Sequence, residues 1–311
     1  MKHIIIDCDP GHDDAIALLL ALAHKNELKI ELITTIGGNQ SLNKVTINAL
    51  KVLELTNNNI EVAKGQLGPL VRPLTIAPEA HGDTGMNGPI LPNPQLQASA
   101  VHAVKRMAEV VQNSKHKITL VPLGPLTNIA LFIKSYPHLL NKIELISLMG
   151  GGLYQGNVTS AAEFNIYVDP EAAAIVFKSG LPLIMSGLDV TNKAYILNTE
   201  YESLRSKGKI SNFVCELLDF YSIYGKRFGY TGNAMHDPCA IAYLLQPQLF
   251  KAKDLYVQVI TDSDSCRGQT LADNRPKPAH EPNVKVLLDI DREFFVQLLF
   301  DAFSKLDNTC S

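Results

Sequence analysis

The sequence lacks concentrated positive charge. Of its 311 residues, 28 are Lys or Arg and 31 are Asp or Glu, which gives a formal net charge of −3. No run of Lys and Arg is longer than two residues. Nucleic acids and anionic membranes both attract a dense basic face. We therefore expect neither nucleic acid nor membrane as a partner.

Long hydrophobic runs are also missing, although the overall hydrophobic fraction of 46% is too high for a disordered chain. The longest apolar runs, such as Ala15–Ala23, are well below the roughly 20 residues that a membrane-spanning helix needs. The N-terminus has only Ile4, Ile5 and Ile6 before the first carboxylate. A signal peptide needs about 7–15 apolar residues in a row, so we expect no signal peptide and no membrane span.

Cysteine is scarce and scattered. The five cysteines form no Cys-x-x-Cys pair; they are Cys8, Cys215, Cys239, Cys266 and Cys310. An odd, scattered set predicts reduced thiols rather than a disulfide framework or a structural zinc site. We therefore expect a soluble cytoplasmic enzyme.

Short apolar, β-branched runs alternate with helical patterns along the chain. The predicted strands are His3–Ile6, Lys29–Ile36, Ile60–Ala63, Lys117–Leu123, Ile143–Met149, Leu183–Ser186, Leu255–Ile260 and Val284–Ile290. The predicted helices are Asp13–His24, Leu42–Leu55, Ala98–Val111, Leu126–Ser135 and Glu171–Ser179. Near-continuous apolar strands are typical of a sheet that is covered on both faces. The alternation predicts an α/β fold with an open, mostly parallel twisted sheet, which binds ligands at the carboxyl ends of its strands.

The second half of the chain is less regular. Residues 192–236 indicate helices with loops, and Asp262–Pro282 is polar, which favours a surface excursion. Because no shift in composition marks a linker, we expect one domain over residues 1–311. Gly65–Gln97 is rich in Pro and Gly, and we interpret it as a long functional loop.

Four carboxylates fall within eight residues after the first predicted strand. They are Asp7, Asp9, Asp13 and Asp14. A helix N-terminus favours one or two negative charges, but four repel one another unless protons or a cation neutralise them. A hard divalent cation bound by oxygen is the favoured interpretation. Two alternatives stay open at this point: a helix cap with surplus carboxylates, and a Mg²⁺-dependent phosphatase whose nucleophile is Asp7 or Asp9.

The segment Asp7–Ala15 resembles the N-terminal signature of the inosine–uridine nucleoside hydrolases. The resemblance covers essentially the whole chain, and it returns at Gly37–Asn39, His81–Gly85, Gly124–Asn128, Met149–Gly152, Glu163–Asn165 and His236–Pro238. It implies a Rossmann-like nucleoside hydrolase fold and hydrolysis of the N-glycosidic bond of ribonucleosides to ribose and free base, in nucleoside salvage. It also implies a homotetramer or homodimer.

The resemblance implies a Ca²⁺ ion held by the side chains of Asp9, Asp14 and Asp237 and by the backbone carbonyl of Leu123. Ca²⁺ takes 6–8 oxygen ligands, which leaves room for a water and two ribose hydroxyls. Ribonucleosides are therefore expected over deoxyribonucleosides. Asp13 matches the general base that activates the attacking water, and His236 matches a histidine that protonates the departing base.

Further residues match substrate-binding positions of the family. The expected ribose contacts are Asn39, Asn157, Glu163 and Asn165, with Met149 and Phe164 beside them in their motifs; His81 and Phe228 are expected at the base. Turn formation beside glycines is an alternative for Asn39 and Asn157. Core packing is an equal interpretation for the aromatic set Tyr221, Tyr224 and Phe228.

No role is assigned to His12. We expect pyrimidine ribonucleosides, uridine and cytidine, to be the preferred substrates, with weaker activity on purines. Besides the phosphatase, a catalytically silent nucleoside-binding protein is a competing hypothesis; its expected mark, a missing Asp13 or metal ligand, is not seen.

Overall fold

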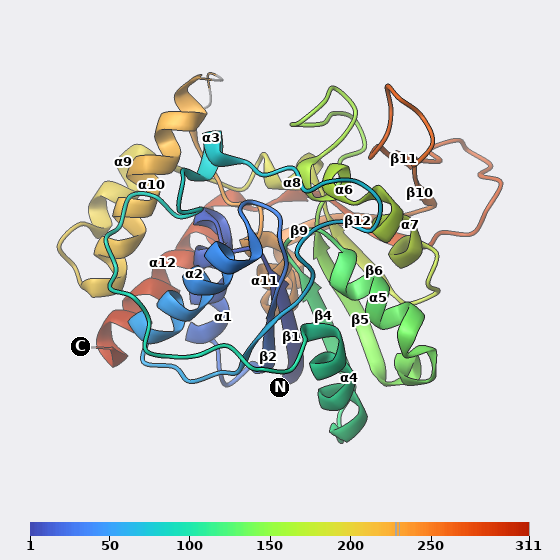
Figure 1. Cartoon of the computed structure of the whole chain (residues 1–311). Helices are drawn as coiled ribbons and strands as arrows, with labels where there is room; N and C mark the ends of the chain where they lie inside the picture. The colour runs from blue at the N-terminus through green and yellow to red at the C-terminus, as the bar shows by residue number, and fades with distance from the viewer. Residues whose placement is uncertain (228, 230, 311) are drawn as a thin grey trace.

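A central eight-stranded sheet organises the computed structural model, which describes residues 1–227, 229 and 231–310 except the side chain of Tyr224 (Figure 1). The strand order is β3-β2-β1-β4-β5-β6-β12-β9. Neighbouring strands are parallel throughout, except that β9 runs antiparallel to β12. The expected open, mostly parallel sheet is therefore confirmed.

The strands of this sheet are β1 (Lys2–Cys8), β2 (Leu28–Thr35), β3 (Val62–Lys64), β4 (Ile118–Pro122), β5 (Ile143–Met149), β6 (Leu183–Ser186), β9 (Phe250–Leu255) and β12 (Val284–Ile290). Two small antiparallel pairs lie outside it, namely β7 (Tyr195–Leu197) with β8 (Gly232–Ala234) and β10 (Val257–Val259) with β11 (Thr270–Ala272).

Helices cover both faces of the central sheet (Figure 1). One face is covered by α1 (His12–Ala23), α2 (Leu42–Leu55), α10 (Lys209–Arg227), α11 (Pro238–Leu245) and α12 (Arg292–Thr309). The other is covered by α4 (Ala103–Asn113), α5 (Thr127–Ser135) and α7 (Pro170–Phe177). The short helices are α3 (Pro78–His81), α6 (Phe164–Val168), α8 (Leu188–Thr191), α9 (Asn198–Tyr201) and the 3₁₀ turns Pro137–Lys142, Glu202–Leu204 and Pro247–Leu249.

Strand β1 shows why its sequence is continuously apolar. Ile4 and Ile6 belong to the hydrophobic core on one side of the sheet, and Ile5 belongs to the core on the other side. All three side chains are fully buried. Alternate residues of a strand point to opposite faces, so a strand that is covered twice needs an apolar residue at every position.

The chain order reverses at β1. Its neighbours are β2 on one side and β4 on the other, so successive crossovers leave β1 in opposite directions. Such a switch point opens a crevice outside the carboxyl ends of the two central strands. Asp9 follows the end of β1 and Leu123 follows the end of β4. The backbone N–H of Leu123 donates to the carbonyl of Asp7 at 2.8 Å, which holds the two strand ends together.

Several predicted elements are confirmed with their bounds, among them Ile143–Met149, Leu183–Ser186, Val284–Ile290 and the helix Leu42–Leu55. The predicted helix from Ala98 begins instead at Ala103. The predicted strand Leu255–Ile260 is wrong as one unit, because β9 ends at Leu255 and β10 begins a different sheet at Val257.

The segment Asp262–Pro282 is only partly a surface excursion. It contains β11, and its residues Arg267 and Thr270 are buried. Arg267 forms a two-pronged ion pair with Glu171 of α7, which ties the segment to the body of the protein.

The five cysteines are all free, as expected. In the part of the chain that the structure describes, no helix combines the length and the hydropathy that crossing a membrane requires.

Candidate active site

The carboxylate cluster forms where β1 passes into α1. The chain turns through Asp9–Gly11, and Asp14 caps the first turn of the helix. Its Oδ1 accepts the backbone N–H of Asp9 at 3.1 Å, and its Oδ2 accepts that of Gly11 at 3.0 Å. Because the cap folds the turn back onto the helix, it brings the carboxylates of Asp9 and Asp14 to the same side of the crevice.

Three buried carboxylates meet here although one comes from a distant part of the chain. Oxygens of Asp13, Asp14 and Asp237 lie within 4.8 Å of one another. Burial, and then the charge of Asp13, raises the pKa of Asp14 to about 7. Burial and the neighbouring carboxylates raise the pKa of Asp237 well above its ordinary value. Mutual repulsion of this kind is relieved by a proton or by a cation.

Asp9 adds a fourth carboxylate with one unused oxygen. Its Oδ2 accepts the backbone N–H of Asn39 at 2.6 Å, whereas its buried Oδ1 has no partner among the described residues. A Cβ at Gly38 would lie 2.1 Å from Asp9 Oδ2, and one at Gly124 would lie 2.3 Å from Oδ1, so both glycines are needed for space. An orphaned buried carboxylate oxygen beside three other carboxylates fits a hard divalent cation.

Asn39 is part of this cluster rather than a surface turn. Its side-chain Nδ2 donates to Asp14 Oδ2 at 3.1 Å and to the carbonyl of Asp9 at 3.2 Å. Two predicted cation ligands are therefore held in place by one amide.

The Leu123 carbonyl also faces a predicted substrate residue. Asn165 Nδ2 donates to it at 2.7 Å and lies 3.3 Å from Met149 Sδ and 3.4 Å from the Met149 carbonyl. A carbonyl oxygen has two lone pairs, so this hydrogen bond leaves Leu123 able to bind a cation.

Glu163 and Asn157 are engaged in local structure. The Glu163 carboxylate caps α6 and accepts backbone N–H groups from Gly151 at 2.8 Å, Asn165 at 3.0 Å and Ile166 at 3.2 Å. Asn157 Oδ1 accepts the backbone N–H of Phe164 at 2.9 Å. Burial raises the pKa of Glu163. Their expected contacts with ribose stay predictions.

His236 lies beside the predicted general base. Burial raises the pKa of Asp13, and the charge of His236 and nearby backbone N–H groups partly offset this rise. The His236 side chain is half-buried, and its Nδ1 lies 2.8 Å from the hydroxyl of Thr191. Thr191 was not predicted, because no motif in the sequence links it to His236, 45 residues further along the chain.

His81 lies against His12, the signature residue that the sequence left without a role. Their Nδ1 atoms are 3.1 Å apart. Tyr221, from α10, stacks on both rings, with ring centroids 5.3 Å from that of His12 and 5.8 Å from that of His81. Phe228, predicted to contact the base, lies outside the described residues, as does the side chain of Tyr224.

Comparisons with known proteins decide between the remaining hypotheses. The family profile described as inosine-uridine preferring nucleoside hydrolase matches residues 4–297. The chain belongs to this family. The predicted enzyme class, an N-glycosidase that hydrolyses ribonucleosides, is thereby confirmed, and the phosphatase alternative is dropped.

Curated relatives of this nucleoside hydrolase match nearly end to end. The pyrimidine-specific ribonucleoside hydrolase RihA of Shewanella sp. (strain ANA-3) is 51% identical over 307 residues, covering 97% of this chain and 96% of that one. RihA of Enterobacter sp. (strain 638) is 47% identical over 306 residues, covering 97% of each chain.

Solved structures confirm the fold. A purine-preferring ribonucleoside hydrolase from Gardnerella vaginalis has a TM-score of 0.93 at 30% identity, with 100% of both chains covered. The plant nucleoside hydrolase PpNRh1 has a TM-score of 0.90 at 33% identity and covers 97% of this chain and 99% of that one.

Beside the cluster, this nucleoside hydrolase buries the further carboxylate of Asp7, whose Oδ2 has no partner among the described residues. Asp7 Oδ1 accepts Thr34 Oγ1 at 2.6 Å and Asn128 Nδ2 at 2.8 Å. Burial raises the pKa of Asp7 to about 6. Asn128 Oδ1 also accepts the backbone N–H of Gln66 at 3.0 Å, so one amide joins β1 to the start of the predicted functional loop.

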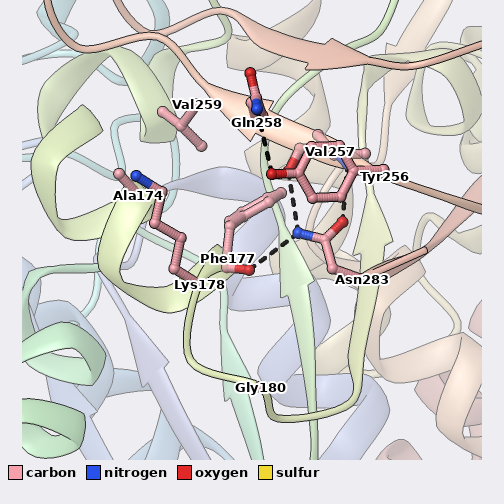
Figure 2. Close-up of a pocket in the computed structure, with 9 residues that line it drawn as sticks. All are labelled: Ala174, Phe177, Lys178, Gly180, Tyr256, Val257, Gln258, Val259 and Asn283. Carbon is pink, nitrogen blue, oxygen red and sulfur yellow. Dashed lines mark hydrogen bonds between the residues drawn. The ribbon is translucent and has the colours of Figure 1, made fainter. Parts of the chain in front are cut away.

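A separate cavity of about 260 Å³ lies between α7 and β10 (Figure 2). The amide of Asn283 in its wall is hydrogen bonded to Phe177 and Val257. None of the residues predicted for the active site lines this cavity, so the carboxylate crevice remains the candidate for catalysis.

Proposed function

We propose that this chain is a Ca²⁺-dependent hydrolase that prefers pyrimidine ribonucleosides and releases ribose and the free base in cytoplasmic nucleoside salvage, as a homodimer or homotetramer. The observation that carries the proposal is the orphaned Asp9 Oδ1 beside the buried group Asp13, Asp14 and Asp237. So much uncompensated negative charge in an apolar setting is stable only with a counter-ion or bound protons.

The cation ligands would be the carboxylates of Asp9, Asp14 and Asp237 and the carbonyl of Leu123. All four supply oxygen, which suits the hard Ca²⁺ ion. When bound, Ca²⁺ supplies positive charge that binds vicinal ribose hydroxyls and makes a nearby water easier to deprotonate. A 2′-deoxyribonucleoside lacks one of these hydroxyls and is expected to react poorly.

Asp13 would act as general base and accept a proton from the water that attacks the anomeric carbon. Burial raises the pKa of this carboxyl, and nearby backbone N–H groups of His236 and Asp237 favour its charged form, which is the form that accepts a proton. As the glycosidic bond breaks, positive charge grows on the ribose ring, and the surrounding carboxylates stabilise that charge.

His236 would donate a proton to the departing base. For this step the ring would start as an imidazolium, with Nδ1–H donating to the Thr191 hydroxyl 2.8 Å away and the charge of Asp13 favouring the cation. Transfer of the Nε2 hydrogen to the base then leaves a neutral ring. A departing base that takes up a proton leaves as a neutral molecule, so the barrier to cleavage falls.

Preference for pyrimidines is supported by the relatives. Those at 47–51% identity over nearly the whole chain bear the name pyrimidine-specific, whereas the purine-preferring structure is 30% identical. We expect uridine and cytidine to be cleaved faster than inosine and adenosine.

Reducing-sugar release from uridine, cytidine, inosine, adenosine and 2′-deoxyuridine tests the proposal, with EDTA and after adding back Ca²⁺ or Mg²⁺. We expect reducing sugar to be released from the pyrimidine ribonucleosides. This release should be lost with EDTA and should return with Ca²⁺. Equal cleavage of uridine and 2′-deoxyuridine would overturn the role of the hydroxyls. Full activity in EDTA would show that hydrolysis does not depend on a bound cation.

The variant Asp13→Asn separates catalysis from binding. It keeps the side-chain shape and is expected to bind uridine while losing at least 100-fold in turnover. Turnover close to wild type would exclude Asp13 as the base, and no turnover by the wild type with Ca²⁺ present would favour the silent nucleoside-binding protein.

A further inference from the structure

Two imidazole rings meet beside the carboxylate cluster, and the contact between them needs one shared proton. The Nδ1 atoms of His12 and His81 are 3.1 Å apart. The other nitrogen of His12, Nε2, lies 2.8 Å from the carbonyl oxygen of Asn87. A carbonyl oxygen only accepts hydrogen bonds, so His12 Nε2 carries a hydrogen.

His12 is a neutral ring in this setting. Its residue is fully buried, and it stacks on the rings of Phe220 and Tyr221, with interplanar angles of 3° and 8°. Within the described residues its two ring nitrogens face only His81 and Asn87, and neither partner is a carboxylate. Burying an imidazolium whose ring nitrogens contact no carboxylate would be costly.

A neutral His12 with its hydrogen on Nε2 presents a lone pair at Nδ1. The proton between the two rings therefore belongs to His81 Nδ1, and the lone pair of His81 is on its Nε2. The backbone N–H of His12 lies 3.4 Å from the same His81 Nδ1. If this backbone N–H donated to His81 Nδ1, that atom would carry a lone pair, and two lone pairs would face each other across the 3.1 Å contact between the rings. The contact between the rings is the shorter of the two, so we assign the hydrogen to His81 Nδ1.

His81 Nε2 makes no hydrogen bond to the described residues, and the ring lies at the cation-binding turn. A Cβ built on Gly11 would be 2.5 Å from His81 Nδ1 and 3.0 Å from Asn39 Nδ2. Glycine at position 11 thus lets the ring lie directly against the turn that holds Asp9 and Asp14, next to the space where a nucleoside would bind.

We propose that His12 is a positioning residue that fixes the tautomer of His81, so that His81 Nε2 accepts a hydrogen bond from an N–H group on the edge of the nucleobase. In uridine this group is N3–H, and in cytidine it is the 4-amino group. His81 then reads the base, while the proton for the leaving group comes from elsewhere. This inference rests on the proposed ribonucleoside hydrolysis.

The tautomer is tested directly by ¹⁵N–¹H correlation spectra of the histidine rings in the full-length protein, with His81→Gln to assign the signals. We expect a protonated Nδ1 and an unprotonated Nε2 for His81. In His12→Leu, which fills the space without an acceptor, the His81 signals are expected to shift toward the other tautomer. A protonated Nε2 in the wild type would overturn the proposal.

Kinetics test the consequence with uridine and 3-deazauridine, which has C–H in place of N3–H. The readout is the ratio of kcat/KM for the two substrates. Relative to wild type, His12→Leu should lower this preference for uridine about tenfold, the effect of one lost hydrogen bond. His12→Asn, whose Oδ1 stands where Nδ1 was, should restore it to within about threefold.

An unchanged ratio in a folded His12→Leu protein would overturn the proposal. If His12→Leu fails to fold, the comparison of His12→Asn with wild type and the wild-type spectra still decide. If the wild type cleaves no nucleoside, the proposed function fails, whereas the spectra still decide the tautomer of His81.

Discussion

Four aspartates within eight residues have four different sets of neighbours. Asp7 accepts hydrogen bonds from Thr34 and Asn128, and Asp9 accepts one from the backbone N–H of Asn39. Asp14 caps its own turn and accepts from the Asn39 amide, whereas Asp13 lies close to Asp14 and Asp237. Identical side chains thus acquire distinct properties from their contacts. Single substitutions can therefore separate the roles of these aspartates.

Replacement of Asp9 by Ala tests the cation site. Because the orphaned Oδ1 is removed with its charge, the affinity for Ca²⁺ should fall roughly 100-fold or more, which corresponds to a loss of about 3 kcal/mol. Calorimetric titration with Ca²⁺ measures this. Asp264→Ala, on an exposed loop, is the control that should bind as wild type does. Equal affinities for all three proteins would remove Asp9 from the ligand set.

Thr191→Val tests the orientation of His236. The substitution keeps the shape of the side chain but removes the hydroxyl that lies 2.8 Å from His236 Nδ1. We expect kcat on uridine to fall about 10–100-fold with little change in the affinity for Ca²⁺. Thr191→Ser, which retains the hydroxyl, should recover most of the rate. A Val variant as fast as the Ser variant would contradict the role of this contact.

At the scale of elements, the site depends on contacts between strand ends. Leu123 after β4 donates its N–H to Asp7 at the end of β1, and Asn128 of α5 bonds to Asp7 and to the carbonyl of Thr35 on β2. The ends of three parallel strands are thereby locked in register. A crevice built on packed strands holds its side chains more rigidly than one built on loops.

Asn128→Ala should destabilise the protein by about 2–4 kcal/mol, because it leaves buried hydrogen-bonding groups on Asp7, Thr35 and Gln66 without a partner. Urea unfolding measures the loss. Asn141→Ala, at an exposed position, is the matched control and should change stability by less than about 0.5 kcal/mol. Similar urea midpoints for the two variants would show that the hydrogen bonds of Asn128 contribute little to stability.

At the scale of the whole molecule, the buried carboxylates couple stability to pH and to the cation. The pKa of Asp14 is raised to about 7 and that of Asp7 to about 6 by burial. Between pH 4 and pH 7 the folded protein thus holds protons that the unfolded chain has released. Its stability without a cation is therefore highest below pH 4 on this account and is lost as pH rises toward 7.

Thermal unfolding in EDTA should accordingly give a Tm that falls by several degrees between pH 5 and pH 8. One pKa unit is worth about 1.4 kcal/mol, and each kcal/mol moves the Tm of a chain of this length by about 1.5 °C. With excess Ca²⁺ the loss should shrink or reverse, because the ionised cluster binds the ion. A Tm in EDTA that rises over this range would contradict the account.

The sequence alone predicted the features that depend on residues close together along the chain. Continuous apolar runs predicted the covered strands, as in Ile143–Met149, and the aspartate-rich turn after the first strand predicted a cation site. Strand β9 was missed because it lies at the edge of the sheet, and its exposed residues Lys251 and Lys253 interrupt the apolar pattern. Helix α12 was not predicted, although its buried Phe295, Leu299 and Phe303 follow at helical spacing.

By itself the sequence determined the α/β fold, the family and the segment that carries the carboxylates, because periodicity and short motifs depend on neighbours along the chain. Only the tertiary structure decided which side chains meet. Asp237 joins Asp13 and Asp14, and His12 meets His81, across separations that no periodicity encodes. Such contacts follow from how the strands are ordered and how the helices pack, so they exist only once the whole chain has folded.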